Sequence, residues 1–493
     1  MYLLGLDIGS SSIKAALVDA RTGKTAGVAN APETEMDILA LHPGWAEQDP
    51  ESWWENCRTA VHKLLQRTGI SPVEVAAIGI SYQMHGLVTI DREGKVIRPS
   101  IIWCDSRAVG IGDAAFHALG EDYCLQHYLN GPGNFTASKL KWVKDHEPEQ
   151  YDRIAYMMLP GDYIAFRLTG EALTTVSGLS EGILWDFTDH NPAQGLLNHY
   201  GIDRSLIPPV TPTFGHQGRL TETAAAYLGL TPGVPVTYRA GDQPNNALSL
   251  NVLNPGEVAA TGGTSGVVYG VVDQMASDRL NRVNSFAHVN HRQELPRIGV
   301  LLCINGAGIQ YSWMRKQVAT DGISYREMEQ LAASVPVGSD GLCMIPFGNG
   351  AERMLGNREL GASLVNLQFN RHGRPHLYRA ALEGVAFSFV YGMKVLRELG
   401  LDVSVIRVGD DNLFQSEVFS STITQLLGCR IEILHTTGAV GAAIASGVGI
   451  GLYADAREGL NALEHIGTYE PQQAGDAWLE AYHHWAAHLE KNL

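Results

Sequence analysis

A carboxylate and an amide follow directly on a predicted strand near the middle of the 493-residue chain. Residues 234–238 (Val-Pro-Val-Thr-Tyr) alternate as in a half-buried strand, which is expected to stop at Gly241. Ligands of open α/β sheets bind just beyond the carboxyl ends of strands, and bare backbone at a glycine lets another group approach closely. Asp242 and Gln243 are therefore candidates to act on a ligand. The alternative is an ordinary Asp in the turn after a strand.

Two turns rich in glycine and hydroxyl groups could hold phosphate. Residues 3–18 read as strand, turn, strand, with Gly9 and Ser10–Ser12 in the turn. Residues 256–269 repeat this pattern around the Gly-Gly-Thr-Ser-Gly turn at 262–266. Successive turn N–H groups form a concave anion site, and hydroxyls add donors. One such element alone could be a plain hairpin. Two of them beside an acidic strand end indicate a nucleotide-dependent phosphotransferase with two related domains facing one cleft.

Further polar side chains follow other predicted strands. Asp7 precedes the first turn and is a candidate Mg²⁺ ligand, because this hard cation prefers one or two carboxylates plus phosphate and water. Residues 82–86 (Tyr-Gln-Met-His-Gly) follow the strand at 75–81, although a histidine placed so is more often structural. Asp105 and Arg107 follow the next short strand, and the alternative for them is an internal ion pair.

Length and charge limit the functional classes. A chain of 493 residues exceeds a single core, so two large domains are expected. The net charge of −16, from 52 acidic and 36 basic residues, argues against nucleic-acid and anionic-membrane partners. A phosphate-bearing ligand must then be held by local devices such as backbone N–H groups and a bound cation.

Cysteine usage and hydropathy favour a cytoplasmic protein. The six cysteines are scattered without a CxxC pair, which fits a reducing compartment. The chain begins almost directly with a predicted strand, so no signal peptide is expected. Residues 433–454 carry no Asp, Glu, Lys or Arg, but their five glycines favour a buried strand, a turn and a small-residue helix over a membrane span.

The remaining elements place these groups. Helices are expected to begin after Asp49 and near Phe135, and a long amphipathic helix is expected over 377–398. A buried strand at 403–408 should run into Gly409-Asp410-Asp411-Asn412, which caps the next helix. The helix from Gly438 could pack tightly behind a nucleotide.

In order and spacing, these motifs together resemble the FGGY family of carbohydrate kinases, and within it the members that phosphorylate xylulose. The resemblance covers nearly the whole chain. The segments that carry it are Asp7–Lys14, Trp45–Pro50, Gln83–Gly86, Trp103–Arg107, Lys139–Trp142, Gly241–Asp242, Gly263–Gly266 and Leu382–Gly384. It implies an α/β fold of two ribonuclease-H-like domains, as in actin and hexokinase, with sugar and ATP in the cleft between them. The sugar-binding domain would span 1–246 and the nucleotide-binding domain 247–493.

The resemblance also implies a reaction, the ATP-dependent phosphorylation of D-xylulose to D-xylulose 5-phosphate. Asp242 would be the catalytic base, and Asp7 and Asp242 would hold Mg²⁺. The implied sugar-binding residues are Gln83, Met84, His85, Trp103, Asp105 and Gln243. The implied nucleotide- and phosphate-binding residues are Ser10, Ser11, Ser12, Lys14, Gly263, Thr264, Ser265, Gly306, Gln310, Gly409, Asp410 and Asn412.

Two positions depart from the family pattern. Gln243 stands where xylulose-phosphorylating members often have Asn, so the amide is kept and its reach changes. At the adenine site the usual glycine-rich run is replaced by residues 409–412, with one glycine and two acids, which bears on nucleotide affinity and pose.

Two other functions remain open at this point. The first is a related kinase for ribulose, gluconate or another polyol, and the second is a sugar or nucleotide sensor without turnover. A homodimer is an expectation from the family alone.

Overall fold

Each of the two units into which the chain folds is built around one main sheet. The computed structural model describes residues 1–319, 322–472 and 476–493. Unit 1 comprises Met1–Leu253, Phe286–Ile298 and Thr436–Leu463, and unit 2 comprises Asn254–Ser285, Gly299–His435 and Glu464–Leu493. The predicted two-domain α/β organisation is confirmed.

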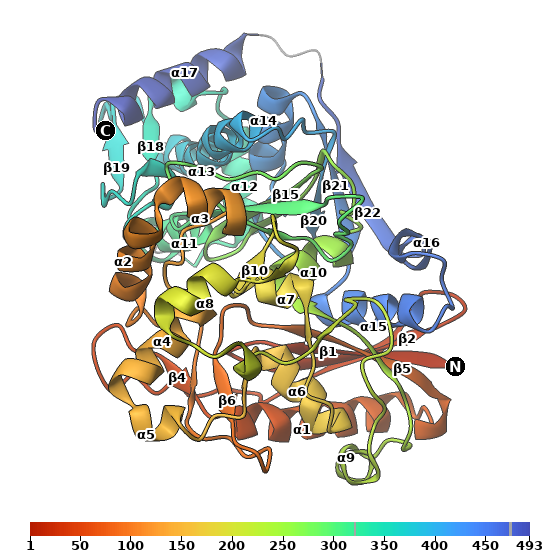
Figure 1. Ribbon diagram of the computed structural model, residues 1–493. Coiled ribbons are helices and arrows are strands. Elements are labelled where there is room, and N and C mark those ends of the chain that lie inside the picture. The colour runs from red at the N-terminus through yellow and green to blue at the C-terminus, as the bar shows by residue number, and fades with distance from the viewer. Residues whose placement is uncertain (320–321, 473–475) are drawn as a thin grey trace. The chain divides into compact units, whose positions relative to one another are not determined.

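The sheet of unit 1 has five strands in the order β13-β5-β1-β2-β3 (Figure 1). Strand β1 is antiparallel to β2 and parallel to β5, which is itself parallel to β13. The predicted strand–turn–strand at 3–18 is therefore a real hairpin. The strands that frame the site are Tyr2–Ile8 (β1), Ile13–Asp19 (β2), Thr25–Ala31 (β3), Val75–Tyr82 (β5) and Val236–Gly241 (β13).

Shorter strands and the helices complete unit 1. The short strands are Glu47–Gln48 (β4), Val88–Ile90 (β6), Ser100–Ile101 (β7), Tyr156–Met158 (β8), Thr174–Thr175 (β9), Trp185–Asp186 (β10), Asn191–Pro192 (β11) and Val210–Thr211 (β12). The helices are Pro50–Thr68 (α1), Val109–Leu119 (α2), Glu121–Tyr128 (α3), Thr136–His146 (α4), Pro148–Tyr151 (α5), Pro160–Thr169 (α6), Val176–Glu181 (α7), Gln194–Tyr200 (α8), Glu222–Leu228 (α9), Asp242–Ser249 (α10), Gly438–Gly449 (α15) and Ala456–Leu460 (α16).

Helix α15 comes late in the sequence but packs on the sheet of unit 1, where Figure 1 draws it in blue beside the red strands. Gly5 of β1 pairs with Gly79 of β5. A Cβ atom at either position would overlap the α15 backbone, at Ala439 O or Ala442 O respectively. This close backbone packing explains why a segment of the C-terminal half returns to unit 1, where a single break at 246/247 was expected.

The sheet of unit 2 repeats the strand order of unit 1 in its five central strands. Its full order is β16-β17-β15-β14-β20-β21-β22, with β14 antiparallel to β15 and parallel to β20. The strands are Glu257–Gly262 (β14), Gly266–Val272 (β15), Asn284–Ala287 (β16), Ile298–Ile304 (β17), Val405–Gly409 (β20), Arg430–His435 (β21) and Glu464–Tyr469 (β22), with Cys343–Ile345 (β18) and Ser363–Val365 (β19) in a separate pair. The helices are Gly308–Trp313 (α11), Tyr325–Ala333 (α12), Arg374–Glu398 (α13), Glu417–Leu427 (α14) and Ala477–Glu490 (α17).

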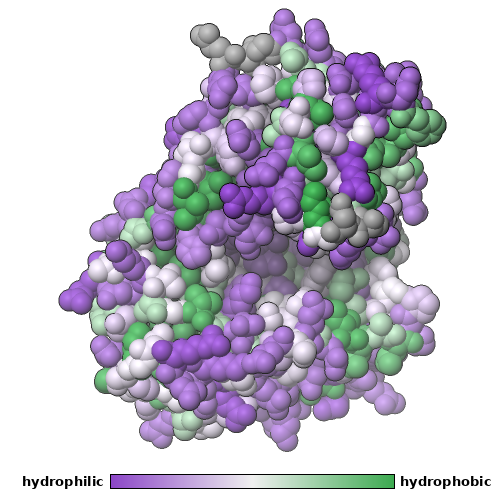
Figure 2. Space-filling model, turned by 180° about the vertical axis from the view of Figure 1, so that it is seen from behind, coloured by the Kyte–Doolittle hydropathy of each residue, from purple (hydrophilic) through white to green (hydrophobic). Residues whose placement is uncertain are grey.

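The surface is largely polar on the face drawn in Figure 2, where the hydrophobic patches are small and separate. Within 1–319, 322–472 and 476–493, no helix combines the length and hydropathy that crossing a bilayer requires. The charge-free stretch near residue 440 is the buried helix α15, as predicted.

Candidate active site

Asp242 lies where the sequence predicts it, directly after a buried strand. Strand β13 ends at Gly241, and Asp242 is the first residue of α10. A Cβ atom at position 241 would lie 2.6 Å from Met84 Cγ and 3.3 Å from Glu181 Oε1. The close approach predicted at Gly241 is therefore confirmed, because a side chain there would collide with Met84.

Burial and neighbouring charges change the acidity of Asp242. Its pKa is raised to about 7, mainly by burial and then by the negative charges of Asp7 and Glu181, while hydrogen bonds from Gln243 oppose the rise. A carboxylate with a pKa near neutrality is suited to take a proton from a hydroxyl group and release it again. The amide of Gln243 contacts Asp242 here, and its contact with a sugar stays a prediction.

Asp7 is the second carboxylate of this region. On β1 it stands opposite Lys14 of β2 and Ser81 of β5. Burial raises the pKa of Asp7, whereas the Ser81 hydroxyl and the charge of Lys14 lower it. Since Asp7 and Asp242 act on each other electrostatically, they form a local negative centre. One or two carboxylates completed by phosphate oxygens suit Mg²⁺, so these residues fit the predicted ion.

The first turn of α15 approaches Asp7. A Cβ atom at Gly438 would lie 2.8 Å from Asp7 Oδ2. Asn245 Nδ2 donates to Gly438 O (2.9 Å) and so ties α10 to the start of α15. Neither Gly438 nor Asn245 was predicted as a site residue. The glycine directly after a Thr N-cap was the signal that could have identified Gly438.

The predicted sugar loop follows β5. Gln83 and Met84 are buried, and Gln83 Nε2 donates to Gln48 Oε1 (3.3 Å). His85 has a φ of 60°, in the left-handed region that few residues other than glycine adopt. Its side chain is 18% exposed. Of the three predicted residues, His85 is thus the one whose side chain is open to a ligand.

A buried lysine holds this loop in place. Lys139 Nζ donates to His85 O (2.8 Å) and to Ile102 O (2.9 Å), which joins the sugar loop to the segment that leads into Trp103. Burial lowers the pKa of Lys139 to about 7. The edge of the His85 ring packs against Phe135, with ring centroids 4.8 Å apart. Lys139 therefore acts on the candidate sugar site through the backbone.

Trp103 and Asp105 have different environments. The Trp103 side chain is exposed, and its Nε1 donates to Ser10 Oγ (3.3 Å). Asp105 is fully buried, accepts from Ala46 N (2.6 Å) and forms an ion pair with Arg107. The prediction that Asp105 contacts sugar is corrected, because its carboxylate is occupied by these internal partners. The alternative interpretation, an internal ion pair, is the one that the structure shows.

The turn between β1 and β2 keeps its polar groups at the surface. Gly9 N donates to Ser12 O (3.1 Å), which closes the turn, while Ser11 and Lys14 are exposed. The backbone carbonyl oxygen of Ser10 accepts a hydrogen bond from Gln48 Nε2 (2.7 Å). Phosphate binding by this turn remains a prediction.

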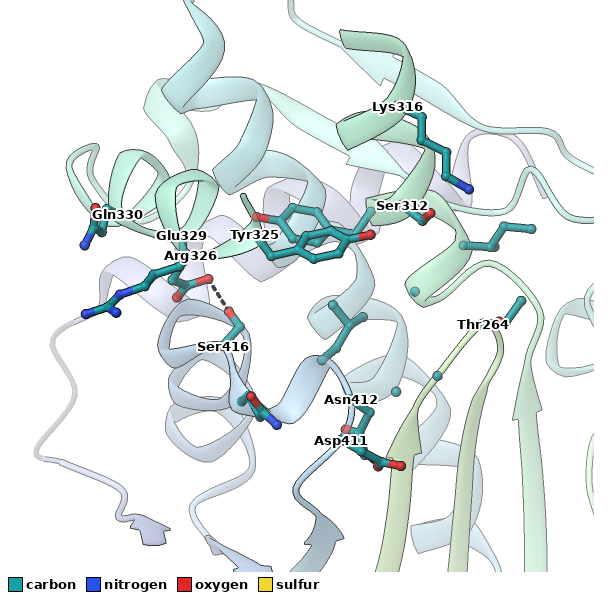
Figure 3. Close-up of a pocket in the computed structure, with 17 residues that line it drawn as sticks. Thr264, Ser312, Lys316, Tyr325, Arg326, Glu329, Gln330, Asp411, Asn412 and Ser416 are labelled. Carbon is teal, nitrogen blue, oxygen red and sulfur yellow. Dashed lines mark hydrogen bonds between the residues drawn. The ribbon is translucent and has the colours of Figure 1, made fainter. Parts of the chain in front are cut away.

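Unit 2 contains a cavity of about 910 Å³ beside its own turn (Figure 3). Thr264 and Lys316 lie at one end of it, Arg326 and Gln330 lie at the other, and Tyr325 lies between them. The lining residues are Gly262, Gly263, Thr264, Gly308, Ile309, Tyr311, Ser312, Lys316, Tyr325, Arg326, Glu329, Gln330, Asp411, Asn412, Leu413, Gln415 and Ser416. Three of the predicted nucleotide residues, Gly263, Thr264 and Asn412, are therefore brought together at one cavity.

Two predicted nucleotide residues face another part of unit 2. Gly306 N donates to Glu352 Oε1 (3.0 Å), and a Cβ atom at Gly306 would overlap Pro346 O. Gln310 is buried, and its Nε2 contacts Met344 Sδ (2.8 Å). Both residues pack against the segment around β18, and their contact with nucleotide stays a prediction.

Gly308 is the glycine of this segment that lines the cavity. Its N–H donates to Gly263 O (2.9 Å), and Ile309 N donates to Thr264 O (3.1 Å). A Cβ atom at Gly308 would overlap Gly263 O. Gly308 lies two positions after Gly306 in the same glycine-rich run and was not among the predicted nucleotide residues.

The two acids at the predicted adenine site are oriented differently. Asp410 Oδ2 lies 2.7 Å from His435 Nδ1, and this contact raises the pKa of His435. Asp411 lines the cavity. Gly409, Asp410 and Ser265 do not belong to its lining as far as the described residues show, so their nucleotide contacts stay predictions. One of the two negative charges is thus paired with a histidine.

An aromatic pair that the sequence analysis missed forms one wall of the cavity. Tyr311 and Tyr325 stack with centroids 5.6 Å apart and an interplanar angle of 24°. The Arg315 guanidinium lies 4.6 Å from the Tyr325 ring centre. Tyr325 is 43% exposed and lines the cavity, so part of its aromatic side chain is open to a ligand. Tyr311 and Tyr325 belong to different helices, so no spacing in the sequence indicated that their rings would stack.

Comparison with known proteins identifies the family of the chain. A xylulose kinase of Bacillus subtilis is 28% identical over 468 residues, which cover 93% of this chain and 90% of the relative. An L-xylulose/3-keto-L-gulonate kinase of Escherichia coli is 32% identical over 482 residues, covering 94% and 91%. The crystal structure of a xylulose kinase from Rhodospirillum rubrum superposes with a TM-score of 0.89 at 28% identity, covering 100% of this chain and 99% of the other.

Models of the FGGY family of carbohydrate kinases match both halves of the chain. The N-terminal domain model matches residues 2–249, and the C-terminal domain model matches residues 258–450. The strand orders of units 1 and 2 agree with the two-domain actin/hexokinase-type fold of this family. The chain therefore belongs to the FGGY family of carbohydrate kinases.

Proposed function

We propose that this carbohydrate kinase transfers the γ-phosphoryl group of ATP to the terminal C5 hydroxyl of D-xylulose. The observation that carries the proposal is the placement of Asp242 beside the loop that presents His85. The base follows β13, the loop follows the neighbouring parallel strand β5, and Gly241 lets Met84 of the loop reach the strand end. Relatives named as xylulose kinases over nearly the full length support this sugar.

The chemistry assigned to Asp242 follows from its environment. A phosphoryl transfer with a loose transition state depends mainly on alignment and charge neutralisation. Asp242 aligns the sugar hydroxyl and accepts its proton as the oxygen attacks the γ-phosphorus, and ADP leaves. His85 and Gln243 orient the other hydroxyl groups of the sugar, and Trp103 forms an exposed wall nearby.

We assign the cavity of unit 2 to the nucleotide. The turn at Gly263 and Thr264 offers backbone N–H groups and a hydroxyl to phosphate. Lys316 at the same end adds a positive charge. Because the chain as a whole is negatively charged, such a local charge is needed to attract phosphate. The exposed face of Tyr325 suits the adenine ring. Ser10–Ser12 and Lys14 are retained as further candidates for phosphate contacts.

Asp7 and Asp242 would hold Mg²⁺, which supplies charge neutralisation on the phosphate oxygens when it is bound. This assignment rests on the two carboxylates acting on each other and on the Asp7 position on β1. Asp7 itself is only partly buried.

L-Xylulose or 3-keto-L-gulonate is the second candidate substrate. The relative named for these two sugars has the higher identity, 32% against 28% for the xylulose kinases. The chemistry of Asp242 would be the same, and the difference would lie in the residues that orient the remaining hydroxyls. The sensor without turnover is not carried further, because the family match shows a kinase.

The test is a specificity profile of the purified protein with Mg·ATP. ADP release is measured with D-xylulose, L-xylulose, D-ribulose, L-ribulose, D-gluconate and glycerol. The proposal expects the highest kcat/KM with D-xylulose. A higher value with L-xylulose would replace the substrate and keep the mechanism, and no turnover with any of the six would refute the proposed activity. The cytoplasmic location and the homodimer remain predictions.

A further inference from the structure

Glu181, at the end of α7, is a buried carboxylate that the proposed chemistry has not used. It is 1% exposed. Its Oε2 accepts the backbone N–H of His85 (2.6 Å) and lies 3.0 Å from His85 Nδ1. Its carbonyl oxygen lies 2.8 Å from the same ring nitrogen. Two atoms of one residue thus hold both the backbone and the ring of His85.

These contacts determine which ring nitrogen of His85 carries the proton. Both neighbours of Nδ1, the carboxylate oxygen and the carbonyl oxygen of Glu181, can only accept hydrogen bonds. Nδ1 must therefore be the donor, which leaves Nε2 of the neutral ring as an acceptor. An acceptor at Nε2 is what a sugar hydroxyl needs as its partner. Glu181 also stabilises the left-handed backbone at His85, which lacks the freedom of a glycine.

The other oxygen of Glu181 faces the strand end that delivers the base. Glu181 Oε1 lies 3.3 Å from the position of a Cβ atom at Gly241, the residue before Asp242. The negative charge of Glu181 is among the causes that raise the pKa of Asp242, after burial and the charge of Asp7. It also raises the pKa of Tyr82, again after burial. Glu181 thus lies between the sugar loop and the strand end that precedes Asp242.

We propose that Glu181 is a positioning residue of the sugar site, which fixes both the ring and the backbone of His85. The inference rests on the proposed sugar phosphorylation. The charged and titratable groups around this pair come from several elements of unit 1: Asp7 of β1, Tyr82 of β5, His85, Lys139 of α4, Asp162 of α6, Arg239 of β13 and Asp242 of α10.

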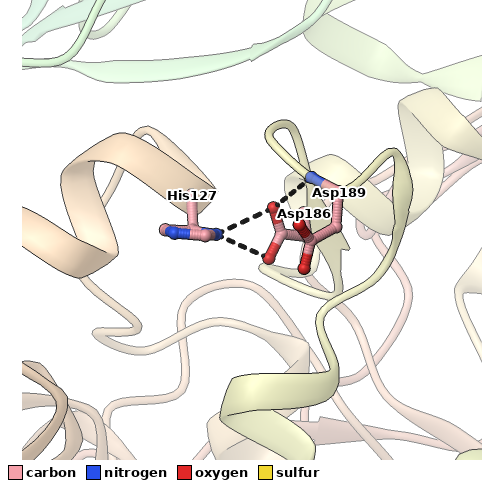
Figure 4. Close-up of side chains that lie close together, drawn as sticks. All are labelled: His127, Asp186 and Asp189. Atoms are coloured by element: carbon pink, nitrogen blue, oxygen red, sulfur yellow. Dashed lines mark hydrogen bonds and ion pairs between the residues drawn. The ribbon is translucent and has the colours of Figure 1, made fainter.

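The chain offers a matched control in a second buried carboxylate bonded to a histidine. Asp186 is also 1% exposed, and its Oδ2 lies 2.8 Å from His127 Nδ1 (Figure 4). Asp186 Oδ1 accepts the N–H groups of Thr188 and Asp189. The contacts found for Asp186 among the described residues do not include the sugar loop. An Asp186→Asn variant therefore removes a similar charge without touching His85.

The kinetic test compares Glu181→Gln, Glu181→Ala and Asp186→Asn with the wild type. Glu181→Gln keeps an acceptor for the His85 N–H, so its sugar KM should lie closer to the wild-type value than that of Glu181→Ala. Glu181→Ala loses the acceptor, so the sugar KM should rise about 10-fold or more, the effect of one lost charge-assisted hydrogen bond, while the ATP KM stays within about twofold. Asp186→Asn should change neither KM. A wild-type sugar KM in Glu181→Ala would overturn the proposal.

A measurement without substrate separates this proposal from the proposed activity. The carbon-13 shift of the His85 ring, assigned with His85→Asn, reports which nitrogen is protonated in the wild type and in Glu181→Ala. The proposal expects the Nδ1–H form in the wild type and a loss of that preference in the variant. A neutral His85 protonated on Nε2 in the wild type would overturn the role of Glu181 even if the enzyme is active. The expected tautomer in a protein that phosphorylates none of the sugars would refute only the proposed activity.

Discussion

Replacing Asp242 with Asn should abolish catalysis and stabilise the protein at the same time. The folded-state pKa of about 7 lies well above the ordinary value of 3.8, so the fold disfavours the ionised form. Between these two pKa values the native state binds more protons than the unfolded state, and stability falls as pH rises. At 1.36 kcal/mol per pKa unit, the ionisation of Asp242 lowers the free energy of unfolding by about 4 kcal/mol at pH 8 and by about 2 kcal/mol at pH 5. Asparagine has no charge and escapes this penalty.

Two assays on the same preparations follow from this. Loss of a general base lowers kcat by about 10²–10⁴-fold. Thermal unfolding at both pH values should show Asp242→Asn above the wild type, with a Tm gain about 5 °C larger at pH 8 than at pH 5. Asp186→Asn serves as the control and should lose stability at both pH values, because its carboxylate accepts hydrogen bonds from His127 and two backbone N–H groups. A kcat near the wild-type value, or a Tm gain independent of pH, would refute the reasoning.

The remaining predictions concern the cavity of unit 2 and the sugar loop. Gly308→Ala should lose about 1–3 kcal/mol of stability and bind ATP more weakly, because its Cβ atom would overlap Gly263 O; unchanged ATP binding by calorimetry would contradict this. Tyr325→Ala should raise the ATP KM by about 2–10-fold through loss of an aromatic surface, and an unaltered KM would exclude stacking on this ring. Lys139→Met should raise the sugar KM but not the ATP KM, because it leaves two buried carbonyl oxygens without their donor; equal changes in both constants would indicate a general loss of structure.

The sequence predicted elements and strand-end chemistry well, because these depend on local patterns. The alternation over 234–238 and the glycine at 241 were sufficient to place Asp242 at a strand end. The paired hairpins likewise predicted two related domains. Helix α15 was predicted as a helix, but its return to the sheet of unit 1 depends on Gly5 and Gly79, whose importance appears only when the helix backbone lies against them.

Long-range side-chain contacts were beyond the sequence patterns. Glu181 contacts His85 across 96 positions in the chain, and no local spacing connects the two. The place of Gly308 at the cavity was missed for the same reason, since only the packing of Pro346 and Gly263 distinguishes Gly306 from Gly308. Asp105 was misassigned because a buried ion pair and a ligand-binding acid have the same residue type and the same position after a strand.

The most direct test of the central claim determines whether the transferred phosphate is attached to C5 of the sugar. D-Xylulose labelled with carbon-13 at C5 is incubated with Mg·ATP and either the wild type or Asp242→Asn, and the product is analysed by phosphorus-31 NMR. The account predicts one phosphomonoester signal, split by coupling to the labelled C5, that forms with the wild type and fails to form with Asp242→Asn. A phosphomonoester without that coupling, release of inorganic phosphate alone, or the same product at the same rate with Asp242→Asn would contradict it.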